Sequence, residues 1–551
     1  MKRVLEDPYY YLANFETALA WVRTRSADLL DAAESGFMSE FPTLPRASRA
    51  LLVRMIMRKG TLFRSDKLRY AEIGCPLAAA AALAERGWVD ANPLLGLEQL
   101  FGLYGKAELA QMFGKPAATA GRKAQMLAAL LPGRERPQAL SAWHPQAAGP
   151  VYELRIMPLC ERVRLMFFGN LRQDWTEFVL ADLGMYRYEK VDFAPSARAF
   201  PRRNDVDDYL FLHHCGERLE AAEQAGGQAD TLLLEIPPRP YANEWVERRR
   251  VRLLEHLGRE LERSGQLPAA LRAYRRGGPG ACRVRAIRML ERLGRTRTAL
   301  RWLEAIARDG RADEAELQAL RRIGPRLRRR LGLPAAPVPK AAAIPLLRLR
   351  LPPAPGSVEE AARARLERDG GTVYYVENTL INALFGLLCW DALYAALPGA
   401  FFHPFQSGPA DLRSPAFHKR RQALFDACLA HLDSDAYKRV IRRNFHAKTG
   451  LQSQFVAWQA LDETLLELAL ECIPAAHLRR WFERLLADPA ANRAGLPDLI
   501  QFWPDTGGYR LVEVKGPGDR VQDNQRRWLD DCITHGMPVA VCHVQWEAAA
   551  P

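Results

Sequence analysis

The segment from Pro497 to Gly518 constrains the fold of this chain more strongly than any other. Two short apolar runs, residues 499–503 and 509–515, flank the turn-forming residues 504–508. Two strands joined by a Gly-rich turn form a β-hairpin. The Gly-Pro-Gly sequence at 516–518 ends the second strand. The segment therefore predicts a strand pair near the C-terminal end of the chain.

Three charged residues lie at the open end of this mainly apolar hairpin. Side chains alternate along a strand, so Glu513 and Lys515 share one face with Leu511, and the neighbouring valines occupy the other. Asp498 opens the first strand, and the hairpin brings it close to Glu513 and Lys515. A strand that is apolar on both faces is expected to be buried, where charged residues need a reason. The alternative is that Glu513 and Lys515 are solvent-facing residues of an ordinary strand pair.

The chemistry of these residue types predicts cleavage of a phosphodiester. Two carboxylates and a backbone carbonyl suit Mg²⁺ or Mn²⁺, which prefer oxygen ligands. Such a metal lowers the pKa of its bound water and neutralises charge on the phosphate. Asp498 and Glu513 are the candidate metal ligands, and Lys515 is the candidate that orients or deprotonates the attacking water.

The pattern Pro497-Asp498…Glu513-Val514-Lys515 resembles the PD-(D/E)xK nuclease core, in its VRR-NUC branch. A helix expected after the lysine carries Gln525 and Trp528, three residues apart as in that branch. The resemblance implies that Gln525 faces the active site, where it positions a water or the phosphate. It also implies that Trp528 packs the helix onto the sheet.

Two further segments extend the resemblance beyond the nuclease core. Residues 54–70, rich in arginine and lysine, and residues 405–412, Phe-Gln-Ser-Gly-Pro-Ala-Asp-Leu, are similar to segments of the Fanconi-associated nuclease family, here in a bacterial-type member. That family places Glu377 as a further metal carboxylate. The implied metal set, for one or two Mg²⁺ or Mn²⁺ ions, is Glu377, Asp498, Glu513 and the carbonyl of Val514.

The family resemblance implies a structure-specific DNA nuclease that cuts near 5′ flaps, with 5′-flap endonuclease and 5′→3′ exonuclease activity, in DNA interstrand crosslink repair. Its implied partner is branched DNA, especially a 5′-flap duplex, with repair proteins as further candidates and a monomer as the expected state. The expected location is the nucleoid-associated cytoplasm in a bacterium and the nucleus otherwise. A Holliday-junction-type resolvase and a non-catalytic DNA-repair scaffold are the alternatives.

Composition agrees with a nucleic-acid partner. The 551 residues include 78 Lys+Arg against 64 Asp+Glu, a net charge of +14, which favours phosphate binding. Nine cysteines without a C-x-x-C pair favour neither a zinc site nor a disulfide framework. The N-terminal residues lack the apolar core of a signal peptide. Residues 379–402 are interrupted by Asn382 and Asp391, which predicts a buried helix rather than a membrane span.

The predicted fold class is multidomain: mainly α-helical N-terminal and repeat domains, followed by a C-terminal α/β PD-(D/E)xK nuclease core. The expected parts are a helical DNA-binding domain (1–91), a SAP-like DNA-binding module with a linker (92–150), a helical TPR-like repeat domain with a linker (151–355) and the VRR-NUC nuclease domain (356–551). The turn at 60–64 is expected to join two helices and present basic residues to DNA. The candidate DNA-binding residues are Arg54, Arg58, Lys59, Arg64, Lys67, Lys106, Lys115, Arg122 and Lys123.

An internal repeat supports the helical middle of the chain. The sequence Leu-Glu-Arg-Ser-Gly at 261–265 recurs as Leu-Glu-Arg-Leu-Gly at 290–294, 29 residues later. In both copies the glycine is followed by another helical pattern. This spacing predicts helical hairpins of tetratricopeptide type.

Overall fold

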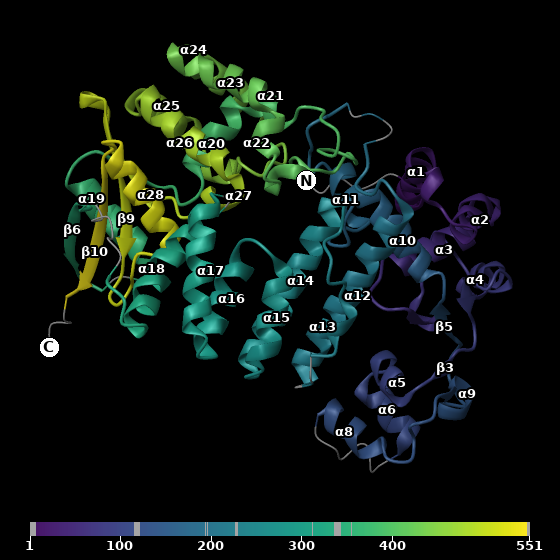
Figure 1. Cartoon of the computed structure of the whole chain (residues 1–551). Helices are drawn as coiled ribbons and strands as arrows, with labels where there is room; N and C mark the ends of the chain where they lie inside the picture. The colour runs from purple at the N-terminus through teal and green to yellow at the C-terminus, as the bar shows by residue number, and fades with distance from the viewer. Residues whose placement is uncertain are drawn as a thin grey trace. The chain divides into compact units, whose positions relative to one another are not determined.

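The computed structural model describes residues 7–114, 122–192, 194, 197–225, 227, 230–310, 312–335, 343–353 and 355–547. The chain divides into two compact units. The first contains residues 1–187 and 194–206, and the second contains residues 188–193 and 207–551. Figure 1 labels their helices and strands.

The first unit is mainly helical, as its sequence predicts. Buried apolar side chains line the inner faces of these helices; α3, for example, buries Leu51, Leu52 and Val53. The helices are α1 (Tyr10–Arg25), α2 (Ala32–Glu40), α3 (Arg46–Ile56), α4 (Pro76–Glu85), α5 (Leu97–Leu103), α6 (Lys106–Phe113), α8 (Lys123–Leu130), α9 (Leu140–Trp143), α10 (Met157–Phe168) and α11 (Thr176–Asp182).

A small sheet corrects the expectation for residues 60–64. Residues Leu62–Arg64 form strand β1, which pairs antiparallel with β5 (Val151–Leu154) instead of serving only as a turn between helices. Strand β2 (Val89–Asp90) pairs with the other edge of β5. Phe63 is buried, and the partner strand lies nearly 90 residues away in sequence, so local propensity could not reveal the pairing.

Residues 94–143 of the first unit form most of a second hydrophobic core, which Val151 and Leu62 of the small sheet complete. Helices α5, α6 and α8 pack around buried Leu100, Leu109 and Met126. Strands β3 (Leu94–Leu95) and β4 (Gln138–Ala139) pair at its base, where the Trp143 indole donates to the Leu95 carbonyl at 2.8 Å. These helices lie within the segment that the sequence predicts to be a SAP-like module.

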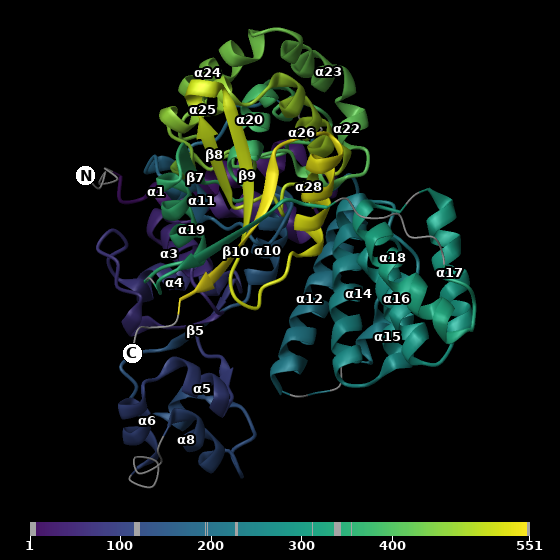
Figure 2. The same cartoon turned by 90° about the vertical axis from the view of Figure 1, so that its left-hand side faces the viewer.

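The second unit begins with a stack of helices that lie side by side (Figure 2). They are α12 (Arg203–Ala225), α13 (Leu232–Glu235), α14 (Glu244–Arg263), α15 (Leu267–Gly277), α16 (Ala281–Arg292), α17 (Thr296–Asp309) and α18 (Glu314–Arg330). Gly265 and Gly294, the repeated glycines, end α14 and α16 with positive φ angles of 78° and 74°. The predicted helix pairs are present, with α14 followed by α15 and α16 followed by α17, and their assignment to the tetratricopeptide type stays a prediction.

A five-stranded mixed sheet forms the centre of the nuclease core. Its strand order is β6-β10-β9-β8-β7. Strands β7, β8 and β9 are antiparallel, and β10 runs parallel to both β9 and β6. The strands are β6 (Leu346–Leu351), β7 (Thr372–Tyr375), β8 (Leu499–Trp503), β9 (Gly508–Lys515) and β10 (Val539–Trp546).

Helices cover both faces of this sheet. On one face, α19 (Val358–Arg368) packs on Val512 and Val514. On the other, Leu511 joins a large core with α28 (Asp523–Thr534), where Trp528 is buried as expected. The other helices are α20 (Leu380–Leu388), α21 (Trp390–Leu393), α22 (Phe417–Arg420), α23 (Gln422–Ala430), α24 (Ala436–Lys448), α25 (Glu463–Cys472), α26 (Ala475–Ala487) and α27 (Pro489–Asn492).

The apolar stretch at 379–402 forms α20 and α21, and both are buried in this core. Among the residues that the structure describes, no helix is both long enough and apolar enough to cross a membrane.

Candidate active site

The β8–β9 hairpin brings the two predicted metal carboxylates together. Leu499 pairs with Val512, so continuing the antiparallel register by one residue sets Asp498 opposite Glu513. The backbone N–H of Val376 donates to the Asp498 carbonyl at 2.8 Å, which extends the pairing of β7 and β8 to this point. Backbone pairing therefore fixes Asp498 and Glu513 opposite each other, at the open end of the hairpin.

The backbone of Val514 orients Asp498. Its N–H donates to Asp498 Oδ2 at 2.8 Å, so the carboxylate takes the place of a ladder partner. In a strand, the N–H and the carbonyl of one residue point toward the same neighbouring strand. The residue opposite Val514 is Pro497, which has no N–H to donate. The Val514 carbonyl consequently receives no ladder hydrogen bond from that position, as a metal ligand requires.

Lys515 lies beside the two carboxylates. Its Nζ is 2.7 Å from Glu513 Oε1, and both side chains are at least nine-tenths buried. Burial raises the pKa of Glu513, and the negative charge of Asp498 raises it further, whereas Lys515 lowers it. Burial likewise raises the pKa of Asp498, against the Val514 hydrogen bond and the Lys515 charge. The pKa values of both carboxylates are thus raised despite Lys515, and both groups favour protonation unless a further cation is near.

The donor set fits a hard divalent cation. Both carboxylate oxygens of Glu513 are buried; the Lys515 ammonium is 2.7 Å from Oε1, and Oε2 accepts no hydrogen bond from the described residues. A buried pair of carboxylates is costly, and the single charge of Lys515 offsets only part of that cost. A divalent cation between Asp498 and Glu513 would satisfy both groups with oxygen ligands.

The structure does not bring Glu377 fully into this cluster. In the described part of the chain, its carboxylate does not join those of Asp498 and Glu513 in a group whose ligand atoms all lie within 4.8 Å of one another. The Tyr375 hydroxyl donates to one oxygen, and the Asn378 side chain donates to the other at 3.2 Å. Glu377 is nevertheless close enough for its charge to raise the pKa of Asp498. Its role as a ligand stays a prediction.

Gln525 caps its own helix. It lies in the first turn of α28, and its Oε1 accepts a hydrogen bond from the Gln522 N–H at 2.8 Å. No hydrogen bond among the described residues joins Gln525 to Asp498 or Glu513. Its predicted contact with water or phosphate therefore stays a prediction.

Asn378 positions the site, although the sequence reasoning missed it. It is the one described residue other than glycine with a positive φ, 52°, a conformation that asparagine tolerates well. Its side chain donates to Glu377 and accepts from the Leu496 N–H at 3.1 Å, two residues before Asp498. An asparagine directly after Glu377 is the only signal that the sequence offered.

The predicted DNA-binding residues divide into two sets. Arg54 is held internally, 2.6 Å from Glu72 and over the Tyr11 ring. Arg64 is held by Asp66 at 2.8 Å and by Glu108 at 2.7 Å. The exposed set is Arg58, Lys59, Lys67, Lys106, Arg122 and Lys123. Lys115 lies outside the described residues.

A mixed sheet that ends in two buried carboxylates and a lysine defines a metal-dependent nuclease. Family models agree with this class. The VRR-NUC domain matches residues 433–546, the FAN1 HTH domain matches residues 9–90, and the Fanconi anemia-associated nuclease SAP domain matches residues 94–143.

Relatives that match nearly all of this chain then identify the family. A Fanconi-associated nuclease 1 homolog from Pseudomonas aeruginosa is 54% identical over 98% of this chain and 97% of its own length. The homolog from Arabidopsis thaliana is 25% identical over 97% of this chain and 67% of its own. The crystal structure of paFAN1 bound to 2nt 5′-flap DNA with a gap matches with a TM-score of 0.95 and 52% identity, covering 99% of this chain and all of that one. The chain belongs to the Fanconi-associated nuclease family. It is accordingly a DNA nuclease, and the family implies dependence on a divalent metal.

Proposed function

We propose that this protein is a structure-specific nuclease that cuts DNA near 5′ flaps, as a 5′-flap endonuclease and a 5′→3′ exonuclease, with Mg²⁺ or Mn²⁺ as the cofactor. The observation that carries the catalytic part is the buried pair of carboxylates, Asp498 and Glu513, for which Lys515 supplies a single positive charge. The preference for flaps is supported by the similarity to paFAN1, which was crystallised with 1nt and 2nt 5′-flap DNA.

In this proposal Asp498, Glu513 and the Val514 carbonyl hold one or two ions, with Glu377 as a further carboxylate. The bound cation supplies charge neutralisation at the phosphate and a water of lowered pKa. Val514 N–H fixes the orientation of Asp498, and Lys515 orients the attacking water or takes its proton. For Glu377 to bind metal, its carboxylate must exchange the Tyr375 hydroxyl for the ion.

We assign DNA holding to the N-terminal parts. The domain at 1–91 and the SAP-like module at 92–150 would bind duplex phosphates through the exposed basic residues, and the helical repeats at 151–355 would support the nuclease domain at 356–551. Phosphate contacts of this kind carry no sequence information, which suits recognition of DNA shape. Four further parts of the proposal follow from the family alone. They are a role in interstrand crosslink repair, repair-protein partners, a monomeric state and a nucleoid-associated location.

The test compares 5′-labelled and 3′-labelled flap, nicked, four-way and single-stranded DNAs. Wild type and Asp498→Ala are assayed in Mg²⁺, Mn²⁺ and EDTA, and DNA binding is measured separately. The expected result is metal-dependent cutting next to the 5′ flap, which is lost in the variant while binding is retained. Cutting by Asp498→Ala at the wild-type rate would remove the active-site assignment.

The same panel separates the alternatives. Preferential, paired cutting of four-way junctions would keep the active site and favour a resolvase. Tight binding without cutting of any substrate would favour a non-catalytic scaffold, although the presence of Glu377, Asp498, Glu513 and Lys515 argues against it.

A further inference from the structure

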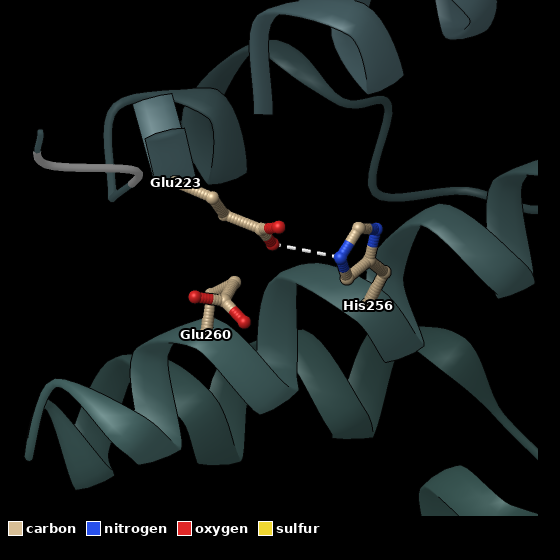
Figure 3. A group of neighbouring side chains, drawn as sticks. All are labelled: Glu223, His256 and Glu260. Carbon is tan, nitrogen blue, oxygen red and sulfur yellow. Dashed lines mark ion pairs between the residues drawn. The ribbon is translucent and has the colours of Figure 1, made fainter. Parts of the chain in front are cut away.

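A second cluster of metal-ligand side chains lies in the helical repeats, outside the nuclease core. His256 and Glu260 are one turn apart on α14, so their side chains share one helical face. Glu223, in the last turn of α12, reaches the same place. One ligand atom from each residue lies within 4.8 Å of the other two. Figure 3 shows the carboxylate of Glu223 directed at the His256 ring, with the carboxylate of Glu260 beside them.

Two buried oxygens in this cluster accept no hydrogen bond from the described residues. They are Glu223 Oε1 and Glu260 Oε1. Each has one nitrogen close by: His256 Nε2 is 2.7 Å from Glu223 Oε1, and Arg263 Nη1 is 2.7 Å from Glu260 Oε1. Arg263 also donates to the other oxygen of Glu260 at 2.9 Å, but its side chain is 73% exposed, so most of its charge is solvated. A divalent cation between the two carboxylates would supply positive charge that these contacts provide only in part.

The contact between Glu223 and His256 is a close polar contact that an ion would have to open. Glu223 Oε1 is 2.7 Å from His256 Nε2, and the two atoms do not form a hydrogen bond. Two ligand atoms at about 2.0–2.1 Å from a tetrahedral ion lie roughly 3.3 Å apart. Metal binding would therefore need these two side chains to separate by less than about 1 Å.

We propose that Glu223, His256 and Glu260 bind a divalent transition-metal ion of the zinc class. One imidazole nitrogen and two carboxylate oxygens form a donor set that Zn²⁺ accepts at about 2.0–2.2 Å, with water completing the tetrahedron. Imidazole suits Zn²⁺, Co²⁺ and Ni²⁺, whereas Mg²⁺ prefers oxygen alone. This site would therefore select a different metal from the all-oxygen nuclease centre.

The bound ion would fasten α12 to α14. Nearer the start of α12, Tyr209 and His213 both contact Arg249 of α14, at 3.2 and 2.6 Å. These contacts are polar, unlike the apolar packing that stabilises most helical repeats. An ion held by Glu223 on one helix and by two residues on the other would fix the far end of the same pair. Its role is structural, at the start of the repeat stack.

The test uses the full chain, stripped of metal with a chelator and titrated with Zn²⁺ in excess Mg²⁺. Zn²⁺ binding is followed by calorimetry and by competition with a chromophoric indicator, and Co²⁺ is substituted to report its visible absorption. The variants are His256→Gln and Glu223→Gln. The matched control is His213→Gln, which alters a histidine in the same helix pair. Glu513→Gln removes the nuclease centre as a second source of binding.

We expect one equivalent of Zn²⁺ to bind in a manner independent of Glu513. Loss of an outer-shell partner alone weakens metal binding by about 10- to 100-fold, so loss of His256 should weaken it by at least about 100-fold. Glu223→Gln should also weaken binding and reduce the Co²⁺ absorption, whereas His213→Gln should bind as wild type does. His256→Gln should still cut DNA in Mg²⁺, and its circular dichroism in EDTA should match that of wild type.

Two results would overturn the proposal. One is wild-type Zn²⁺ affinity and stoichiometry in both His256→Gln and Glu223→Gln. The other is loss of all tight Zn²⁺ binding in Glu513→Gln alone, which would assign the ion to the nuclease centre. If His256→Gln unfolds, Glu223→Gln decides the question, because that carboxylate lies at the end of α12 and is 25% exposed.

Discussion

Replacing Glu513 with glutamine tests two effects of this carboxylate separately: its contribution to cleavage and its destabilisation of the folded state. Both of its oxygens are buried, the Lys515 ammonium is 2.7 Å from one of them, and Asp498 lies beside it. Glutamine has the same shape, carries no charge and can donate its amide to Asp498. We therefore expect Glu513→Gln to stabilise the metal-free protein while abolishing cleavage.

The magnitude follows from the contacts. Burying an ion in a protein costs several kcal/mol of desolvation free energy. Lys515, 2.7 Å from Glu513, offsets part of this cost by its positive charge. A new hydrogen bond to the charged Asp498 contributes about 1.5–3 kcal/mol. The variant loses the Lys515 ion pair, so the net stabilisation in EDTA should be about 1–3 kcal/mol. This corresponds to an increase of about 2–6 °C in the thermal midpoint.

Bound metal should make the wild type more stable than Glu513→Gln. A ligand at 100 times its Kd stabilises the folded state by about 2.7 kcal/mol, and the wild type has both carboxylates with which to bind it. Thermal unfolding of both proteins is measured in EDTA and in saturating Mg²⁺. The control is Glu471→Gln, the same change at an exposed glutamate, which should shift stability by less than about 0.5 kcal/mol.

The reasoning fails if Glu513→Gln is no more stable than wild type in EDTA. It also fails if Mg²⁺ stabilises the variant as much as it stabilises wild type, because the carboxylate would then not be a ligand.

Three further predictions follow from single contacts. Lys515→Met should lower the cleavage rate by about 10²–10⁴-fold without changing DNA affinity, measured in single-turnover assays; an unchanged rate would exclude Lys515 as the residue that serves the water. The double variant Arg58→Ala, Lys59→Ala should reduce the salt dependence of DNA affinity by the equivalent of about two phosphate contacts. Arg54→Met, which breaks the ion pair with Glu72, should instead lower the free energy of unfolding by about 1.5–3 kcal/mol. Burial lowers the pKa of His403 to about 3, so below pH 6.5 the unfolded chain binds a proton that the folded chain excludes, and stability falls by roughly 2 kcal/mol between pH 7 and 5. In denaturant titrations, His403→Gln should lose this fall in stability between pH 7 and 5. An unchanged pH dependence in the variant would refute the assignment to His403.

The catalytic hairpin could be predicted from sequence because its information is local. The apolar runs, the turn and the strand alternation fix which face carries Glu513 and Lys515, and a hairpin needs no distant partner. The helical repeat was predictable for the same reason, since Gly265 and Gly294 end equivalent helices. In contrast, β1 could not be foreseen, because a three-residue strand exists only where β5 pairs with it.

The charges in the sequence did not reveal which basic residues form ion pairs in the fold. The basic residues near position 60 look equivalent in sequence, yet Arg54 and Arg64 bind acidic partners up to 44 residues away, and Arg58 and Lys59 are exposed. The carboxylate of Glu377 is held by Tyr375 and Asn378, and no sequence spacing indicates that geometry.

The sequence by itself determined the reactive pair, the lysine beside it and the family to which the chain belongs, because each depends on residues close together in the chain or on motifs kept intact. Only the tertiary structure decided which charges are buried, which are paired and which converge. Glu223 and His256 are 33 positions apart on different helices, so their meeting depends on helix packing. Hydrophobic periodicity in a sequence shows which face of a helix is buried. It does not show which distant element packs against that face, and such contacts depend on that packing.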